Sequence, residues 1–196
     1  MARRIVIIQG HPDPQGGHFC HALAEAYAKG ATAAGHVVET LEIAKLDIPF
    51  LRNKQEFDTA PLPASLAPAQ ASIAGADHLV IIYPFWLGTM PALMKAFLEQ
   101  VFRTRFLFRM VDPVHRTWSR TLAGKSARVV LTMGMPALVY RFILGAYSLR
   151  SLERNVLGMC GIGPINETLC GNVEKASEWR HRSWLTKMER LGQAGK

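Results

Sequence analysis

The sequence has few cysteines, few charged residues and no long apolar run. Its three cysteines (Cys20, Cys160 and Cys170) are an odd number without paired spacing, which argues against a disulfide framework and indicates a reducing compartment. The longest apolar run lies within residues 79–87 and is far shorter than the roughly 20 residues that a membrane span needs. No long apolar stretch with a cleavage site follows Met1, so we expect no secretory signal and a cytoplasmic location.

Charged residues make up only 19% of the chain, yet the formal net charge is +8. This charge would attract anions. Nucleic acid is disfavoured as a partner because the basic residues are scattered and no basic helix carries interleaved aromatics. A phosphorylated cofactor would account for the positive sign of the net charge. The charge could equally serve only to keep the protein soluble. Hydrophobic residues make up 49%, which is typical of a globular protein, and the 196 residues fit one domain.

Five short apolar, often β-branched runs have the length and composition of strands, most of them buried. They cover residues 5–8, 37–43, 78–83, 127–132 and 164–170. Helical patterns separate them, over residues 19–35, 69–74, 91–102, 142–160 and 173–191. This alternation predicts right-handed crossovers and therefore a doubly wound α/β fold of three layers, a five-stranded parallel sheet with helices on both faces. Residues 44–68 carry four prolines and are expected to form a surface excursion.

Ligands of such sheets bind at the carboxyl ends of the strands, where the strand order reverses. Three loops are therefore candidates: residues 9–18, 84–90 and 132–140. The first is rich in glycine and precedes a helix, which suits a phosphate, although its spacing is not G-x-G-x-x-G. The second places Phe85 and Trp86 at the strand end beside Gly88, where they would either flank a flat ring or pack on a neighbouring helix.

The first loop also raises the question of a metal site. His11-Pro12-Asp13 resembles the start of the His-Pro-Asp-Asp-Glu motif of zinc-dependent deacetylases, but the second aspartate and the glutamate are missing. A catalytic zinc ion needs three protein ligands, and His18 and His21 are better interpreted as surface or capping residues. We therefore expect no metal.

Residues 84–95, which read Pro-Phe-Trp-Leu-Gly-Thr-Met-Pro-Ala-Leu-Met-Lys, together with 99–102, closely resemble a family signature. The family is the NAD(P)H:quinone oxidoreductases of flavodoxin-like fold, the DT-diaphorase relatives. Residues 10–12, Phe19 and 157–162 also match the family, and the order holds over nearly the whole chain. The resemblance implies a flavodoxin-like three-layer sandwich. It also implies a homodimer that binds FMN or FAD and transfers hydride from NAD(P)H to quinones or similar small electrophiles.

The resemblance also assigns roles to individual residues. The flavin phosphate or pyrophosphate is expected next to one group, namely His11, Gly17, His18, Phe19 and Cys20. The isoalloxazine ring is expected next to a second group, namely Pro84, Phe85, Trp86, Leu87, Gly88, Thr132, Met133, Gly134 and Tyr140. Substrate is expected on Trp86 and, across a dimer, on Phe106, Phe108 and Met110. Phe106, Phe108 and Trp118 lack an obvious place in the core, which favours a dimer but also allows a flap over their own subunit.

Tyr140 is the one expected catalytic residue, as a donor to the N1/O2 edge of the flavin; a turn residue at the surface is the alternative. The chain departs from the family at His18, at the Thr132–Pro136 loop and at Ala146, where the family often has a histidine. Two other function classes stay open, a flavin-binding electron carrier and an ancillary binding subunit without turnover. An acidic surface would be typical of a carrier, and the charge here is +8.

Overall fold

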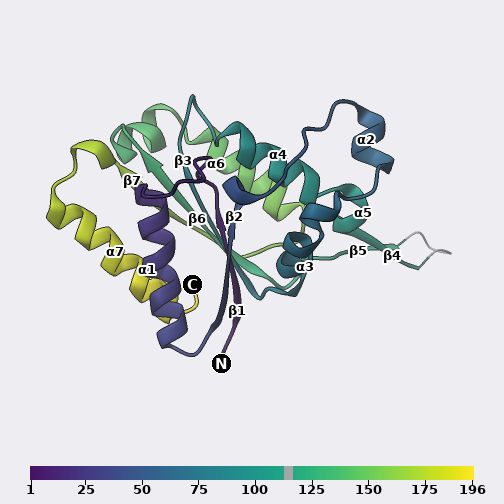
Figure 1. Ribbon diagram of the computed structural model, residues 1–196, viewed down its shortest axis with the longest axis horizontal. Helices are drawn as coiled ribbons and strands as arrows, with labels where there is room; N and C mark the ends of the chain where they lie inside the picture. The colour runs from purple at the N-terminus through teal and green to yellow at the C-terminus, as the bar shows by residue number, and fades with distance from the viewer. Residues whose placement is uncertain (113–116) are drawn as a thin grey trace.

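The structure is a computed structural model that describes residues 1–112 and 117–196. Five parallel strands form its central sheet in the order β2-β1-β3-β6-β7 (Figure 1). The strands are β1 (Arg4–Gln9), β2 (Val37–Glu42), β3 (His78–Pro84), β6 (Ser126–Met133) and β7 (Ile165–Gly171). The doubly wound α/β prediction and all five predicted strands are therefore confirmed, with bounds that differ by one or two residues.

Helices cover both faces of the sheet, because successive residues of a strand point to opposite sides. Ile5 and Ile7 pack in one core cluster beneath α1 (Phe19–Ala33) and α7 (Glu178–Gln193). Val6 and Ile8 belong to the other cluster, on the opposite face of the sheet. That face is covered by α3 (Ala67–Gly75), α4 (Ala92–Val101), α6 (Tyr147–Ser151) and the π-helical segment η4 (Leu152–Gly158). The central strand β3 is buried over its whole length, as its continuous apolar sequence predicts.

The register of the sheet brings three loops to one edge. β1 pairs with β2 on one side and with β3 on the other, so the strand order reverses between β1 and β3. The first residue after β1, Gly10, donates its N–H to the carbonyl of Ile82 at 2.7 Å. Phe85, the first residue after β3, donates its N–H to the carbonyl of Thr132 at 2.8 Å. The exits of β1, β3 and β6 therefore lie side by side at the carboxyl edge of the sheet.

Between α4 and β6 the chain forms an element that the sequence patterns did not predict. A short helix α5 (Thr104–Leu107) leads into an antiparallel hairpin of β4 (Phe108–Asp112) and β5 (Thr117–Arg120). The hairpin projects away from the body of the molecule (Figure 1). Nothing is described of residues 113–116 or of the side chains of Arg109, Asp112, Thr117 and Trp118, so the expectation for Trp118 lies outside the described part.

The structure adds detail to the predicted excursion, and two helix predictions need correction. The excursion over 44–68 holds local structure, namely the end of η1 (Ile43–Lys45), α2 (Lys54–Thr59) and η2 (Ala64–Leu66). The helix predicted over 142–160 is broken, because Gly145 and Ala146 adopt positive φ angles of 66° and 48° between the π-helical segment η3 (Val139–Ile143) and α6. The last helix begins at Glu178 rather than 173, because Ser177 caps it by accepting from the N–H of Arg180 after η5 (Val173–Lys175).

Within the described residues, no helix combines the length and apolar character needed to cross a membrane. All three cysteines are free and buried. No cluster of three or more metal-ligating side chains is arranged to hold a metal ion in residues 1–112 and 117–196.

Two glycines set the distance between α1 and α7. A Cβ atom at Gly192 would overlap the carbonyl oxygen of Tyr27, and one at Gly30 would overlap the carbonyl oxygen of Glu189. The helix backbones therefore touch here, and any larger residue must push them apart.

Gly192→Ala should lower the free energy of unfolding by about 1–3 kcal/mol, because the extra methyl group forces the two helices to separate. Gly75→Ala is the matched control. Its Cβ would meet only the Arg4 guanidinium at ordinary distances of 3.5–3.8 Å, so it should leave stability unchanged or raise it by up to about 1 kcal/mol. Urea denaturation of both variants measures the difference, and equal effects would show that the close approach is not maintained.

Candidate functional site

The first loop leaves β1 through a closely packed backbone. A Cβ at Gly10 would lie 3.0 Å from the carbonyl oxygen of Ile82 and from the sulfur of Met94, so the chain turns directly above β3. At Gly17 the φ angle is +77° and no atom lies within 4 Å of a built Cβ. The loop is therefore tight at its start and open where the helix begins, which leaves room for a ligand.

Three histidines gather on this loop. The rings of His11 and His18 are stacked with centroids 3.8 Å apart, and His21 lies 5.6 Å from His11. His11 is only 7% exposed, and burial, followed by the neighbouring imidazoles of His18 and His21, lowers its pKa to about 4. His18 contacts the carboxylate of Asp13 at 2.7 Å, and this hydrogen bond lowers the pKa of Asp13. Near neutral pH, His11 is therefore an uncharged polar group rather than a cation.

The start of α1 adds backbone donors to these rings. His18 is the N-cap residue but makes no side-chain cap, and the first amides of a helix have no partner inside it. Phe19 and Cys20 are the first two helical residues, so their backbone N–H groups point to the loop. Their side chains do not: Phe19 packs edge-on against His181 at 4.8 Å, and the Cys20 thiol contacts the Thr132 hydroxyl at 3.2 Å. These two residues can serve an anion through the backbone only.

The second loop is a tight turn with Trp86 at its base. Trp86 and Thr89 exchange backbone hydrogen bonds of 2.9 and 3.0 Å. The residues between them, Leu87 and Gly88, both have positive φ angles (43° and 86°), as in a type I′ turn. Leu87 therefore holds a conformation that non-glycine residues rarely adopt, and such strain clusters at ligand sites. Nothing lies within 4 Å of a Cβ built on Gly88.

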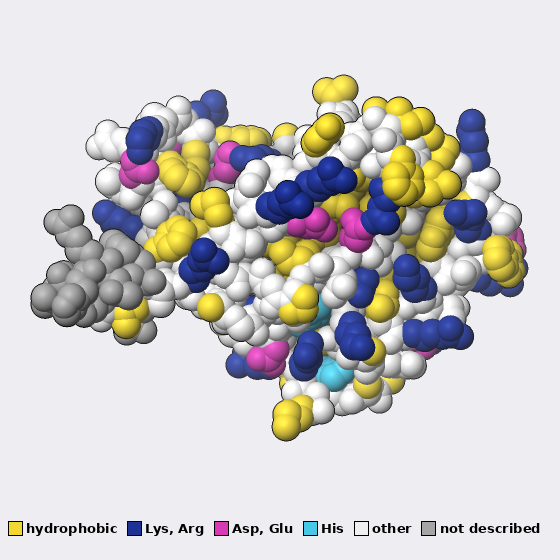
Figure 2. Space-filling model, turned by 180° about the vertical axis from the view of Figure 1, so that it is seen from behind, with side chains coloured by type: hydrophobic (Ala, Val, Ile, Leu, Met, Phe, Trp, Pro, Cys, Tyr) yellow, Lys and Arg dark blue, Asp and Glu magenta, His cyan; other side chains and the backbone are white. Residues whose placement is uncertain are grey.

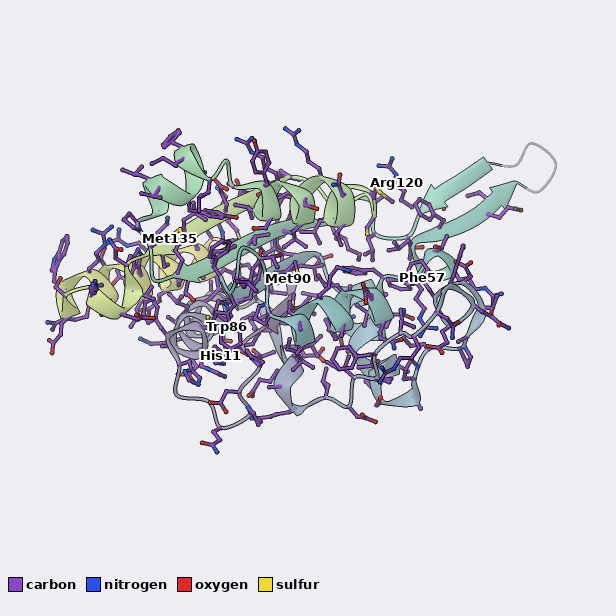
Figure 3. The ribbon with its side chains drawn as sticks, turned by 90° about the horizontal axis from the view of Figure 1, so that it is seen from above. His11, Phe57, Trp86, Met90, Arg120 and Met135 are labelled. Carbon is purple, nitrogen blue, oxygen red and sulfur yellow. The ribbon has the colours of Figure 1, made fainter. Side chains whose placement is uncertain are left out.

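The two aromatic residues of this loop point in different directions. The Trp86 side chain is 49% exposed, and its ring meets His11 edge-on at 5.7 Å, so the first and second loops touch (Figure 3). Phe85 packs instead on the ring of Tyr140 at 4.8 Å, within the core. The backbone N–H groups of Phe85 and Trp86 already donate to the carbonyls of Thr132 and Thr89. Trp86 alone offers an open aromatic face here.

The third loop contributes mainly backbone. Thr132 and Met133 end β6 with buried side chains (5% and 2% exposed), whereas Gly134 is exposed. The loop is held down at Met135, whose carbonyl accepts the N–H of Asn172 at 2.9 Å. Of the predicted residues on this loop, only Gly134 is open to a ligand.

Tyr140 lies inside the protein and is 1% exposed, so the alternative of a surface turn residue is wrong. Its hydroxyl contacts the Ser148 hydroxyl at 2.9 Å and accepts the N–H of Leu149 at 3.2 Å. In this conformation the hydroxyl joins η3 to α6 and does not reach the open loops. Its predicted role as a donor to the flavin stays a prediction, and it requires the hydroxyl to give up at least one of these partners.

A hollow of about 590 Å³ opens next to the second loop, between α4, the hairpin and η4. Thr89 and Met90 line it on the side of the second loop, and Phe108 lines it on the side of the hairpin. Ser148, the partner of Tyr140, also faces it. Phe106 and Phe108 pack against the main core, and Met110 is 43% exposed on β4. Three predicted substrate residues, Phe106, Phe108 and Met110, thus lie on α5 and the hairpin, whereas the fourth, Trp86, meets His11 at the second loop.

The sequence reasoning missed Gln9. This residue ends β1, is 1% exposed, and its Oε1 accepts the N–H of His11 at 3.2 Å. Its Nε2 is buried and finds no hydrogen-bond partner among the described residues. An unpaired buried donor costs free energy, and this one lies at the start of the first loop, where a ligand could accept from it. The signal was a single polar residue at the carboxyl end of an otherwise apolar strand.

Comparison with known proteins identifies the class of fold. The model of the family described as Flavodoxin-like fold matches residues 3–190, so the chain belongs to that family. A ribosyldihydronicotinamide dehydrogenase-like protein, traD of Penicillium crustosum, is 26% identical over 155 residues, which are 67% of this chain and 57% of that protein. The chain thus spans little more than half the length of this curated relative.

Solved structures agree with this fold. An NAD(P)H:quinone oxidoreductase from Methanothermobacter marburgensis superposes with a TM-score of 0.82, at 20% identity and with 100% of both chains covered. An FMN-dependent NADH-azoreductase from Bacillus anthracis str. Ames Ancestor, solved in complex with FMN, gives a TM-score of 0.72 at 11% identity, with 97% of this chain and 98% of that chain covered.

The buried His11 makes stability depend on pH. Its pKa is about 4 in the folded protein, against about 6.5 in an unfolded chain. Between these values the unfolded chain binds a proton that the folded chain does not, so the free energy of unfolding should fall as the pH falls from about 6.5 through about 4. His78, buried next to Ser126, has the same direction of shift. Urea titrations at several pH values should show a smaller loss for His11→Gln and for His78→Gln. An unchanged pH profile in both variants would contradict this assignment.

Tyr140→Phe tests the two roles of that hydroxyl. Removing it leaves the buried N–H of Leu149 unpaired and should lower the free energy of unfolding by about 1–3 kcal/mol. A donor to the reacting flavin would in addition slow its reduction by NAD(P)H on the order of 10²-fold, measured by rapid mixing. Ser148→Ala is the control, because it keeps the bond from Leu149 to Tyr140. A stability loss with an unchanged reduction rate would make Tyr140 structural only.

Proposed function

We propose that this chain is a flavin-dependent oxidoreductase that takes hydride from NAD(P)H and reduces quinones or similar small electrophiles. The observation that carries this proposal is the contact between Trp86 and His11. It joins a half-exposed aromatic ring to a loop of polar rings and free helix amides. A flavin cofactor has two matching parts, because its flat ring could stack on the aromatic side chain and its phosphate could bind the polar loop.

The first loop suits the phosphate end of FMN or FAD. The amides of Phe19 and Cys20 lie at the positive end of α1, where anions are stabilised. Gly17 leaves open space beside them. His18 and the neutral His11 supply further polar groups for a phosphate. The residues present therefore fit a flavin phosphate, although they do so with His18 where the family often has a hydroxyl.

The second and third loops suit the ring. The Trp86 face is open to stacking, and Gly88 leaves room for a ring edge. Backbone amides at the tip of the turn and in the third loop can stabilise negative charge that develops on the pyrimidine side. When bound, the flavin supplies the acceptance of hydride from NAD(P)H and its delivery to the electron acceptor. The contribution of the chain is to hold the ring, to orient the incoming molecules and to exclude water from one face.

The hollow beside Met90 suits the electron acceptor. Its volume of about 590 Å³ lies within the usual range of small-molecule sites, and apolar side chains from α4 and η4 line much of it.

We also propose a homodimer in which the projecting hairpin, with Phe106, Phe108 and Met110, reaches the site of a second copy. The supporting observations are the hairpin's extension from the body and the exposure of Met110 (Figure 1). We further propose a cytoplasmic location, because three free thiols suit a reducing compartment.

Purification followed by chromatography of the released flavin is the direct test. Bound flavin together with steady oxidation of NADH or NADPH in the presence of a quinone would support the proposal. The chromatography would also distinguish FMN from FAD. Flavin without NAD(P)H oxidation would instead indicate an electron carrier. Absence of flavin at saturating FMN and FAD would favour an ancillary binding subunit.

Trp86→Ala should weaken FMN binding by about tenfold or more, because stacking on an aromatic ring contributes roughly 1–3 kcal/mol. Trp179→Ala is the matched control, since Trp179 is 74% exposed at the start of α7 and should leave affinity unchanged. Quenching of FMN fluorescence measures both. Equal affinity in the two variants would remove Trp86 from the site.

A further inference from the structure

The end of the third loop and the segment after it turn large apolar side chains outward. Four of them are 69–76% exposed and one is 45% exposed. We call this set the apolar ridge: Leu138, Phe142, Ile143, Leu144 and Tyr147. Figure 2 shows hydrophobic side chains gathered at the upper right, over this part of the molecule. Isolated exposed apolar residues are common, but a contiguous group marks a contact surface.

The local backbone explains why the apolar ridge is exposed. The buried Tyr140 fixes η3 to α6 through Ser148 and Leu149, so one side of the segment faces the core. The positive φ angles of Gly145 and Ala146 then reverse the chain. The other side of the segment cannot also face the core, so it is exposed to solvent at the carboxyl edge of the sheet.

Arginines border the apolar ridge. Arg141, Arg150 and Arg154 are exposed and line the same surface hollow as Phe142. Arg141 pairs with Glu167, and Glu153 lies in the field of all three arginines. Both glutamates are half-buried, whereas Arg150 and Arg154 are exposed. The surface next to the apolar ridge is therefore positive, as the neighbouring Lys and Arg side chains in Figure 2 illustrate.

We propose that the apolar ridge docks on an anionic lipid bilayer. Phenylalanine, tyrosine and aliphatic side chains enter the boundary between headgroups and acyl chains, while flanking arginines pair with anionic headgroups. A second copy of the chain fits less well. A two-fold contact centred on the apolar ridge would bring together two surfaces bordered by arginines, in a protein of net charge +8.

Docking in this way would face the candidate site toward the lipid. The apolar ridge follows β6, and the turn at Leu87, which is fully exposed, follows the parallel strand β3 at the same edge. Apolar electron acceptors dissolve in that phase. This last consequence rests on the proposed function, whereas the docking itself does not.

Sedimentation with vesicles tests the docking. The whole protein should bind vesicles of mixed phosphatidylcholine and phosphatidylglycerol at low salt, and should not bind phosphatidylcholine alone. The double variant F142S/I143S should lose binding, and R150Q/R154Q should weaken it on the order of tenfold or more. Val37→Ser is the matched control, because Val37 is a 63% exposed aliphatic residue at the opposite edge of the sheet, and it should bind like the wild type.

Three results would overturn the proposal. These are a wild type that stays in solution with anionic vesicles, a double variant that binds as well as the wild type, and a double variant that turns a dimer into a monomer with no change in lipid binding. Circular dichroism establishes that the variants are folded, and the lipid and salt dependence of the wild type stands without them. Flavin content and NAD(P)H oxidation in solution should be unchanged in F142S/I143S. A protein that binds vesicles but holds no flavin would therefore refute only the proposed function.

Discussion

The parallel pairing of β1 with β3 is the constraint on which the rest of the site depends. The chain places β2 on one side of β1 and then crosses to place β3 on the other, so the exits of both strands open at one edge. The bond from Gly10 to Ile82 and the bond from Phe85 to Thr132 continue the sheet pairing beyond the strands. They fix the loops before any ligand arrives, and the edge contact of Trp86 with His11 follows from that geometry.

This edge holds several groups that cost stability. The Nε2 of Gln9 is buried without a partner among the described residues, Leu87 holds a positive φ angle, and the first turn of α1 lacks a side-chain cap. Each of these costs stability that the buried strands and the close packing of α1 on α7 offset. Elsewhere the same chain uses ordinary devices, such as the Ser177 cap of α7.

Local patterns in the sequence were sufficient for the sheet and its covering helices. Continuous apolar runs such as 78–83 leave few alternatives to a buried parallel strand. The hairpin at β4 and β5 was missed because its residues do not alternate cleanly and its role is outside the core. The helix over 142–160 was predicted whole because its apolar spacing is helical, but the backbone at Gly145 and Ala146 breaks it.

The site was predicted to the level of loops rather than of side chains. Trp86 and His11 do meet, as their places after neighbouring strands indicated. The directions of Phe85, Cys20 and Tyr140 could not be foreseen, because each is decided by packing with residues distant in the sequence or on another element. Gln9 was overlooked because a polar residue at a strand end has no motif. Spacing along the chain locates a loop, and tertiary packing decides which of its atoms remain free.

The three thiols have a consequence for a protein proposed to handle electrophiles. Thiolates, not protonated thiols, attack quinones, and burial raises the pKa of Cys20 and Cys160 to about 11 and that of Cys170 to about 12. Cys20 lies in the first turn of α1, where a reactive sulfur would be open to alkylation by the proposed substrate, yet it is 2% exposed and hydrogen-bonded to Thr132. The molecule thereby keeps sulfur close to its chemistry in a form that resists self-inactivation.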